Sequence, residues 1–444
     1  MNKGVHLTGM RAFSIVWAGQ IISLLGTSMT GFGLTIWAYE RTGSATALAL
    51  VGFFFVTPML VMSPLAGALV DRSNRKLMMM VSDLASGSAT ILILFLLQSG
   101  SLQIWHLYLA SAISGSFQAF QWPAFSAAIT TMLPKEHYGR ANGMMSLAES
   151  GSGIFAPLLA GALLSIIHLR GILTIDIVTF VLAVSALLVV HVPQPSQTLA
   201  GKESQGSLWK ESIYGFHYIL RRPSLLGLQI IFLIGNFITG IAFAVLAPML
   251  LARTGNNEVV FGTVSSIGAV GGVLGGLVMS AWGGPRRRVH GVLAGWAISC
   301  LSGTLLMGLG RSLPVWAAAS FLGSFMVPFI NGSNQAIWQA KVAPDVQGRV
   351  FSTRRLIAWF SGPLSTLIAG PLADYVLEPA MRGGSLVRVF GPLVGSGPGT
   401  GMSLMFVFAG LVAMVATLSG YAIPAIREVE NLLPDHELQL AVAD

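Results

Sequence analysis

Twelve long apolar runs dominate this chain of 444 residues. A helix needs about 20 mostly apolar residues to cross a bilayer. A backbone in lipid must form its hydrogen bonds internally, so runs of this length are expected to be helices. We therefore predict an all-α membrane protein with twelve transmembrane helices. The predicted spans are 12–38, 46–70, 77–98, 104–132, 141–167, 171–191, 224–251, 259–281, 289–310, 313–340, 350–376 and 401–424.

Charged residues are scarce and unevenly placed. Only 9% of the residues are charged, whereas soluble domains carry roughly 25%. If the N-terminus is cytoplasmic, 19 of the 25 Lys and Arg residues fall in cytoplasmic segments, as the positive-inside rule requires. The net charge of +8 therefore indicates a membrane surface rather than nucleic acid. We expect a monomeric, multi-pass protein in the lipid of the bacterial inner membrane, with both termini cytoplasmic.

One long polar stretch divides the spans into two sets of six. The tripeptide Gly-Ser-Phe at 115–117 recurs at 323–325, and Gly-Arg-Ala at 139–141 is matched by Gly-Arg-Val at 348–350. These near-constant offsets predict two parallel six-helix repeats, which many transporters arrange around a midplane site. The predicted units are an N-terminal bundle 1–192, a cytoplasmic linker 193–223, a C-terminal bundle 224–426 and a short cytoplasmic tail 427–444. Within the linker, residues 209–220 are predicted to form an amphipathic helix at the membrane interface.

Two motifs carry a family resemblance. The loop over 67–76 reads Gly-Ala-Leu-Val-Asp-Arg-Ser-Asn-Arg-Lys and resembles the signature loop of the major facilitator superfamily. Asn74 replaces the usual glycine, and asparagine tolerates the left-handed turn that a glycine would supply. The counterpart in the second half has Ser280 where the aspartate would stand. The glycine-rich stretch over 151–161 resembles the antiporter motif of drug exporters.

With Trp-Pro-Ala-Phe at 122–125 and Gly-Arg-Ala-Asn-Gly at 139–143, the chain resembles the macrolide-efflux and enterobactin-exporter branch over nearly its whole length. The resemblance implies the major facilitator fold and secondary active export of a small amphipathic molecule of drug-like, macrolide or siderophore type. It also implies proton antiport by alternating access. A facilitator or proton symporter of the same fold is the alternative.

A membrane enzyme or receptor is disfavoured, because the loops are short and carry no catalytic cluster. No nucleotide-binding or metal-binding motif is present. We therefore expect no catalytic residue, no cofactor and no metal. The expected partners are a small-molecule substrate, protons and membrane lipid, without nucleic acid.

The resemblance further implies a conformational gate at the signature loop. We expect Asp71 to clasp the cytoplasmic start of the eleventh span when the cavity faces outward, with Arg354 and Arg355 as its partners, because arginine–carboxylate pairs are strong and directional. The predicted gate residues are Gly67, Asp71, Arg72, Arg75, Arg354 and Arg355.

Glu149 is the predicted proton-coupling residue. It lies nine residues beyond Arg140, which marks the cytoplasmic entry of the fifth span, so it is about 13–14 Å into a core of about 30 Å. Ionisable groups at that depth are costly and suggest function. The alternative is a protonated carboxyl that bonds to a neighbouring helix. Asp83 and Asp176, in spans that lie at the periphery in this superfamily, are expected to be structural and bonded to Ser or Thr.

Polar and aromatic side chains follow i, i+3, i+4, i+7 spacing in the fourth and tenth spans, so each set lies on one helix face. The resemblance makes spans one, four, seven and ten the central lining. This face suits an amphipathic ligand, although amides can also join neighbouring helices. Since no Lys or Arg accompanies these groups at mid-depth, we expect a neutral or cationic substrate. The predicted substrate-binding residues are Gln20, Gln118, Gln121, Trp122, Phe125, Asn236, Asn331, Asn334, Gln335 and Trp338.

Overall fold

The computed structural model describes residues 9–42, 45–195, 198, 206–384 and 386–436, which contain helices and no strand. The predicted all-α membrane fold is confirmed. In this part of the chain, ten segments are long and apolar enough to cross a membrane. Of the predicted units, 1–8, 196–197, 199–205 and 437–444 lie outside the described residues.

The ten segments account for eleven spans, and a further helix supplies the twelfth. One of them covers 55 residues and is broken at His168, whose φ of 56° interrupts the helix. Both of its ends reach one apolar cluster, which contains Tyr138 at its start and Val190 directly after its last residue. The segment therefore crosses and returns. The fourth helix, of 29 residues, is also long enough to span.

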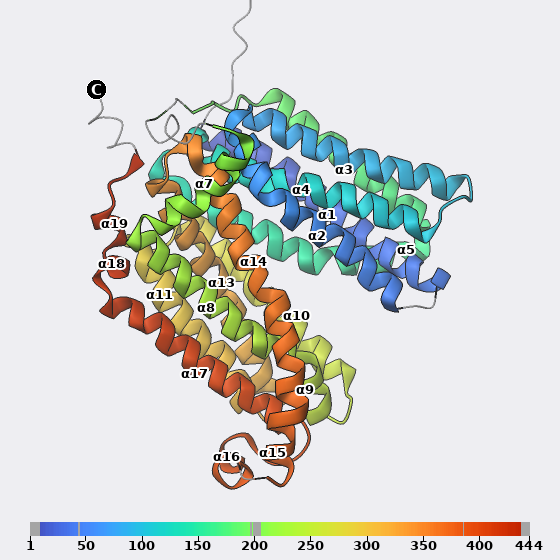
Figure 1. Ribbon diagram of the computed structural model, residues 1–444. Coiled ribbons are helices and arrows are strands. Elements are labelled where there is room, and N and C mark those ends of the chain that lie inside the picture. The colour runs from blue at the N-terminus through green and yellow to red at the C-terminus, as the bar shows by residue number, and fades with distance from the viewer. Residues whose placement is uncertain (1–8, 43–44, 196–197, 199–205, 385, 437–444) are drawn as a thin grey trace, which may run out of the picture.

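The first group of helices forms one bundle, drawn in blue to green in Figure 1. Its members are α1 (Gly9–Thr42), α2 (Ala45–Arg72), α3 (Arg75–Gln98), α4 (Ile104–Met132), the short 3₁₀ helix η1 (Lys135–His137) and α5 (Tyr138–Val189). Small residues let these helices approach closely. A Cβ added to Gly19 of α1 would lie 2.9 Å from the Ala186 side chain of α5.

The second group follows α7 (Leu208–Leu220) and forms the other bundle. Its members are α8 (Pro223–Ala244), α9 (Leu246–Arg253), α10 (Glu258–Trp282), α11 (Arg288–Ser299), η2 (Cys300–Leu305), α12 (Leu306–Leu309), α13 (Leu313–Lys341), η3 (Pro344–Val346), α14 (Gln347–Pro371), η4 (Leu372–Leu377), α15 (Glu378–Arg382), α16 (Val387–Val394), α17 (Thr400–Ala422), α18 (Pro424–Arg427) and α19 (Val429–Leu432). The η2 and η4 segments are single π-helical turns within longer helices.

The two groups meet at one end of the molecule and diverge toward the other. Figure 1 shows α1–α5 running to the right and α8–α17 running downward from the region of α7. We call the region of contact the closed end. Its core includes hydrogen bonds between the groups, from Asn142 to Gln339 (2.7 Å) and from Gln335 to Ser126 (2.6 Å).

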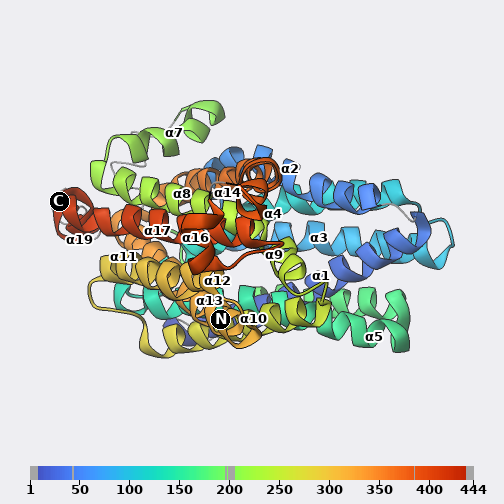
Figure 2. The same ribbon diagram turned by 90° about the horizontal axis from the view of Figure 1, so that it is seen from below.

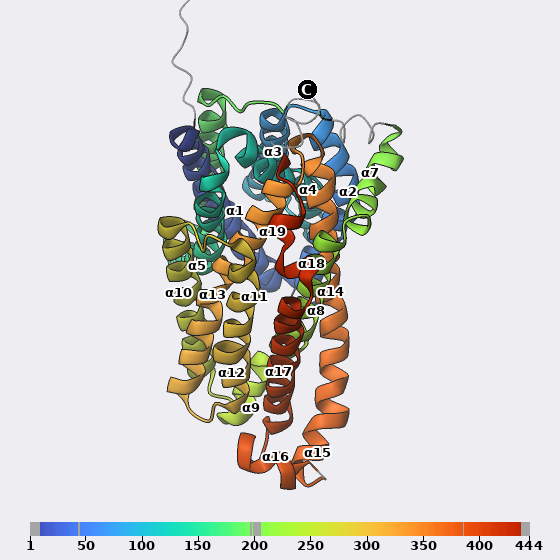
Figure 3. The ribbon, with the colours of Figure 1, turned by 90° about the vertical axis from the view of Figure 1, so that its left-hand side faces the viewer.

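Two peripheral segments also reach the closed end. The helix predicted at 209–220 is confirmed as α7, which projects from the side of the bundle in Figure 2. The segment after α17 runs through α18 and α19 back toward the closed end (Figure 3). There Asp435 forms ion pairs with Lys135 of the first group and Lys341 of the second.

Candidate functional site

The closed end is held by a carboxylate that caps a helix of the opposite group. Asp71, at the end of α2, accepts hydrogen bonds from the backbone N–H groups of Gly348 (2.7 Å) and Arg349 (2.9 Å) in the first turn of α14. These N–H groups have no partner within their own helix, and the positive end of the helix dipole favours an anion. The Arg349 side chain also lies 3.6 Å from the same carboxylate.

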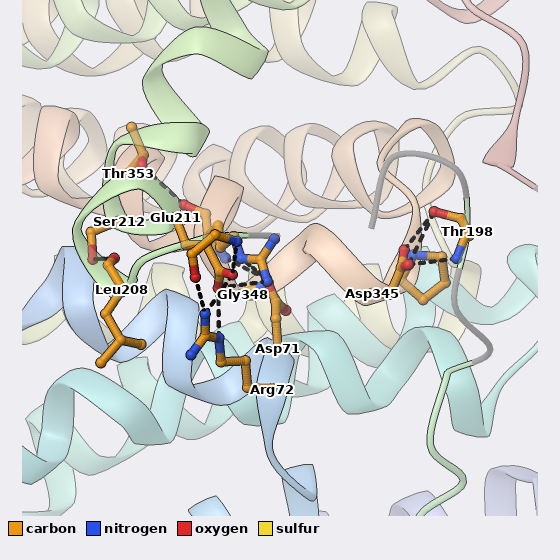
Figure 4. Close-up of polar contacts among 12 residues, drawn as sticks. Asp71, Arg72, Thr198, Leu208, Glu211, Ser212, Asp345, Gly348 and Thr353 are labelled. Carbon is orange, nitrogen blue, oxygen red and sulfur yellow. Dashed lines mark hydrogen bonds and ion pairs between the residues drawn. The ribbon is translucent and has the colours of Figure 1, made fainter. Parts of the chain in front are cut away.

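Glu211 of α7 is a second acidic group at this joint (Figure 4). It accepts two hydrogen bonds from Arg72 (2.7 and 2.9 Å) and pairs with Arg349 at 3.0 Å. Burial disfavours its charge, but the hydrogen bond from Arg72 and the charge of Arg349 outweigh burial and hold the pKa of Glu211 below its usual value. Glu211 therefore joins one arginine from each group of helices.

The backbones of α2 and α14 approach each other closely next to these charged side chains. A Cβ added to Gly67 would lie 2.5 Å from the Gly348 carbonyl oxygen, and a Cβ on Gly348 would lie 2.5 Å from the Gly67 carbonyl oxygen. The related interface joins α5 to α10, where a Cβ on Gly143 would lie 2.7 Å from the Ser280 amide. The Ser280 hydroxyl bonds within its own helix to Gly276, so this second interface lacks the carboxylate bridge.

Four of the six predicted gate residues lie at this joint, and two do not. Arg75 is buried and donates to the carbonyls of Ala127 (2.8 Å) and Pro344, the latter in the opposite group. Arg354 and Arg355, however, lie deeper along α14 and face the interior. The prediction that they pair with Asp71 is therefore wrong, because the backbone N–H groups of Gly348 and Arg349 and the Arg349 side chain occupy that carboxylate.

The turn geometry predicted at Asn74 is also wrong. Its φ of −65° is not left-handed, and its side chain instead caps α3 by accepting a hydrogen bond from the Leu77 N–H. Asparagine suits this position as a helix N-cap.

A cavity of about 450 Å³ lies between the two groups of helices, next to the closed end. The first group contributes Gln118, Trp122 and Glu149 to its wall, and the second contributes Asn236 and Arg355. The other predicted residues that line it are Asn331, Asn334 and Gln335. Amides and aromatic rings from both groups thus surround one space.

A smaller chamber of about 160 Å³ extends from this cavity into the first group. Asp83 faces it and accepts hydrogen bonds from Gln20 (2.9 Å) and Gln121 (3.1 Å). Asp176 also faces it and accepts from Thr27 (3.0 Å) and Thr90 (2.9 Å). Both carboxylates are therefore fixed in position.

The two spaces share a wall that contains Glu149, Arg355, Trp122 and Gln118. The Glu149 side chain is exposed, and the space it faces is the cavity. The guanidinium carbon of Arg355 lies near two indole rings, 5.2 Å from the ring centre of Trp122 and 5.0 Å from that of Trp359. Its charge attracts that of Glu149. A carboxyl group and a guanidinium group thus line the same wall, where the chamber opens into the cavity.

Not every predicted substrate-binding residue reaches this space. Gln20, Gln121 and Phe125 line the chamber. Trp338, in contrast, is 0% exposed and lies in the apolar core. Its indole N–H donates a hydrogen bond to the Asn334 side chain (3.1 Å), and the guanidinium carbon of Arg354 lies 4.3 Å from its ring centre. Its predicted contact with substrate is therefore wrong, since the Arg354 side chain covers it.

The sequence prediction that no basic side chain accompanies the central amides is also wrong. Arg354 donates to Gln335 (2.9 Å) and, with Arg355, lines the cavity. Asp83 was expected to bond to Ser or Thr, but its hydrogen-bond partners are the amides of Gln20 and Gln121. No sequence pattern brings Asp83 together with Gln20 and Gln121, because the three residues lie on different helices. Arg354 and Arg355, in contrast, are adjacent charges inside a predicted span, which was a signal of a function in the interior.

Among the described residues, no group of three or more His, Cys, Asp or Glu side chains could hold a metal ion.

Comparison with known sequences identifies a family of transporters. The sequence model of the Major Facilitator Superfamily matches residues 16–366. Macrolide efflux protein A of Streptococcus pyogenes is 26% identical over 369 residues, which are 82% of this chain and 90% of that protein. The multidrug efflux pump Tap of Mycolicibacterium fortuitum is 27% identical over 379 residues, 80% of this chain and 90% of the pump.

Solved structures show the same fold at low sequence identity. A bacterial homologue of the iron transporter ferroportin, in an outward-facing state, has a TM-score of 0.63 and 15% identity, and the match covers 92% of this chain and 99% of that one. The human organic anion transporter MFSD10 has a TM-score of 0.60 and 14% identity, with the same coverage.

Proposed function

Because the chain belongs to the Major Facilitator Superfamily, we propose that this multi-pass membrane transporter exports a small amphipathic molecule in exchange for protons. It is a transporter rather than an enzyme. The efflux proteins named above are its relatives at 26–27% identity, which supports the direction of export and a drug-like or macrolide substrate. We further propose that it acts as a monomer in the bacterial inner membrane.

The observation that carries the proposal is the shared wall of the chamber and the cavity. Glu149 and Arg355 come from opposite groups of helices and line the same space, which is closed at one end. A movement of one group against the other changes the surroundings of both charges. Transporters with two repeats use such rocking to expose a central site alternately to each side.

We propose that Glu149 exchanges a proton for the substrate. When the cavity opens outward, a proton neutralises Glu149 and removes its attraction for a cationic or hydrogen-bonding substrate, which leaves. When the cavity opens inward, the proton passes to the cytoplasm, and Arg355 stabilises the carboxylate until new substrate binds. The exchange follows from the different affinities of the two states for the two ligands.

The substrate is proposed to be amphipathic and to carry a cationic group. Asp83, Asp176 and Glu149 give the chamber three carboxylates, and its walls include the rings of Trp17 and Trp122. Aromatic faces attract cations. The larger cavity, with its amides and Arg355, suits the polar remainder of the molecule.

The closed end is proposed to face the cytoplasm, with both termini and the 193–223 linker on that side. The basic asymmetry of the sequence supports this orientation. The gate is then the joint of Gly67, Asp71, Arg72 and Arg75 with the start of α14. A cysteine at Ser207, which is exposed, should be labelled only from the cytoplasmic side, and one at Gly255 only from outside.

Everted membrane vesicles test the proposed function. Vesicles with an acidic interior should concentrate a cationic dye or a macrolide, and collapse of the pH gradient should release it. A facilitator would equilibrate these compounds without concentrating them. Substrate accumulation that persists after the proton gradient is abolished would contradict antiport.

A further inference from the structure

The helix α7 has two faces with different chemistry. Its inner face packs on α2 and α14 and contains Glu211, Gly215 and Tyr218, all buried. A Cβ on Gly215 would lie 2.5 Å from the Arg349 carbonyl oxygen, so this face fits closely against the joint. The outer face projects from the side of the bundle (Figure 2).

The outer face is basic and aromatic. It borders a hollow of about 990 Å³, whose lining includes Trp209, Lys210, Tyr214, His217 and Arg221. Lys210 and Arg221 are exposed, and no described residue forms a hydrogen bond or ion pair with the side chain of either. Trp209 is 77% exposed and Leu220 is 62% exposed.

We infer that this outer face, through Lys210 and Arg221, binds the headgroup of an anionic phospholipid from the adjacent leaflet. Lys and Arg near a membrane surface attract anionic headgroups. Exposed tryptophan and leucine on the same face enter the interfacial region beside the acyl chains. A soluble phosphate would satisfy the basic groups but would leave Trp209 and Leu220 in water, so the combination favours a lipid.

The lipid site is coupled to the gate through the helix itself. Glu211 lies on the inner face between Arg72 and Arg349. Lys210 directly precedes it, and Arg221 caps the other end of the same helix. A lipid that holds the outer face in place also holds Glu211 at the joint. Anionic lipid therefore favours the closed end.

Tryptophan quenching by brominated lipid tests the binding site in the full chain. The protein is placed in nanodiscs that contain increasing fractions of brominated phosphatidylglycerol or brominated phosphatidylcholine. The chain has 10 tryptophans, so the signal of Trp209 is taken as the difference between wild type and Trp209→Phe. The variants are Lys210→Gln with Arg221→Gln, and Arg286→Gln as a control that removes an exposed charge away from α7.

Brominated phosphatidylglycerol should quench Trp209 at a much lower mole fraction than brominated phosphatidylcholine. The double variant should weaken the preference by about 25-fold, at about fivefold per charge, and Arg286→Gln should leave it unchanged. Equal quenching by the two lipids in wild type would overturn the proposal, as would loss of the preference on addition of inorganic phosphate. The comparison of the two brominated lipids in wild type tests the lipid preference even if the double variant does not fold.

Discussion

The Asp71 carboxylate of α2 accepts a 2.7 Å hydrogen bond from the backbone N–H of Gly348 in α14, so a residue of one helical group caps a helix of the other. This contact satisfies hydrogen-bonding groups on both helices. The buried carboxylate gains donors, and the first turn of α14 gains acceptors for N–H groups that its own helix cannot satisfy. Separation of the groups would leave both without partners until water replaced them.

Asp71→Asn should therefore weaken the closed end. Asparagine has a single acceptor oxygen, and its NH₂ group would face the N–H donors of α14. An unsatisfied buried donor costs about 1–3 kcal/mol, so the open fraction should rise by about fivefold or more. The rate of alkylation of a cysteine at Ser63, which is 6% exposed at the joint, measures this in a Cys300→Ala background. Ser280→Ala, at the related interface, is the control; equal rates in Asp71→Asn and wild type would refute the clasp.

Gly67→Ala should open the same joint by steric means. The new Cβ would lie 2.5 Å from the Gly348 carbonyl oxygen, a backbone atom that cannot rotate away. We expect faster alkylation at position 63 and slower transport with little loss of folded protein. Gly153→Ala is the matched control, because no atom lies within 4 Å of its added Cβ. If the two alanine variants behave alike, the close approach of α2 and α14 does not hold the joint.

The ion pairs of Glu211 predict a pH dependence. Its pKa lies below the usual 4.5, so the carboxylate contributes to closure fully above about pH 4.5 and loses that contribution as the pH falls through the lowered pKa. The alkylation rate at position 63, divided by that of a cysteine at the exposed Gly255 to correct for the pH-dependent thiolate fraction, should stay constant from about pH 8 to about pH 5 and rise only in stronger acid. Glu211→Gln should give raised alkylation over the whole range. A wild-type rise centred near neutral pH would mean that another group controls closure.

Two tryptophans from the predicted substrate face should respond differently. Trp122 lines both spaces and stacks on Arg355, so Trp122→Ala should weaken substrate binding by roughly tenfold, as expected for a lost aromatic contact of about 1–2 kcal/mol. Trp338 is covered by protein, so Trp338→Phe should lower thermal stability and leave the binding constant unchanged. Equilibrium binding with a labelled substrate separates the two outcomes, and weaker binding in Trp338→Phe would show that it contacts the substrate.

The spans were predictable from the sequence because lipid leaves the backbone few alternatives. Even α4, which contains Gln118 and Gln121, was found as one of the mostly apolar runs. The reversal at His168 was located to within a few residues by the break between spans. The π-helical turns η2 and η4 were not predicted, because no residue type marks them.

The interior of the site was only partly predictable. The periodicity of α4 placed Gln118, Gln121 and Trp122 on one face, and they line the chamber. The partner of Asp71 was misidentified, because a search for basic side chains overlooks backbone N–H groups at a helix start. Arg354 lies five residues beyond Arg349, about 7–8 Å deeper along the helix, which moves it from the joint to the cavity. Such depth depends on where α14 begins, and helix ends are the least certain part of a sequence prediction.

The central claim is that Glu149 couples proton movement to export, and substrate transport against pH in reconstituted vesicles tests it most directly. Wild type and Glu149→Gln are compared with an imposed pH gradient and with none. The glutamine variant imitates the protonated form, so we expect it to fold and to equilibrate substrate, yet not to concentrate it when the gradient is applied. If Glu149→Gln still concentrates substrate with the pH dependence of wild type, the coupling group is another residue and the account of the shared wall is wrong.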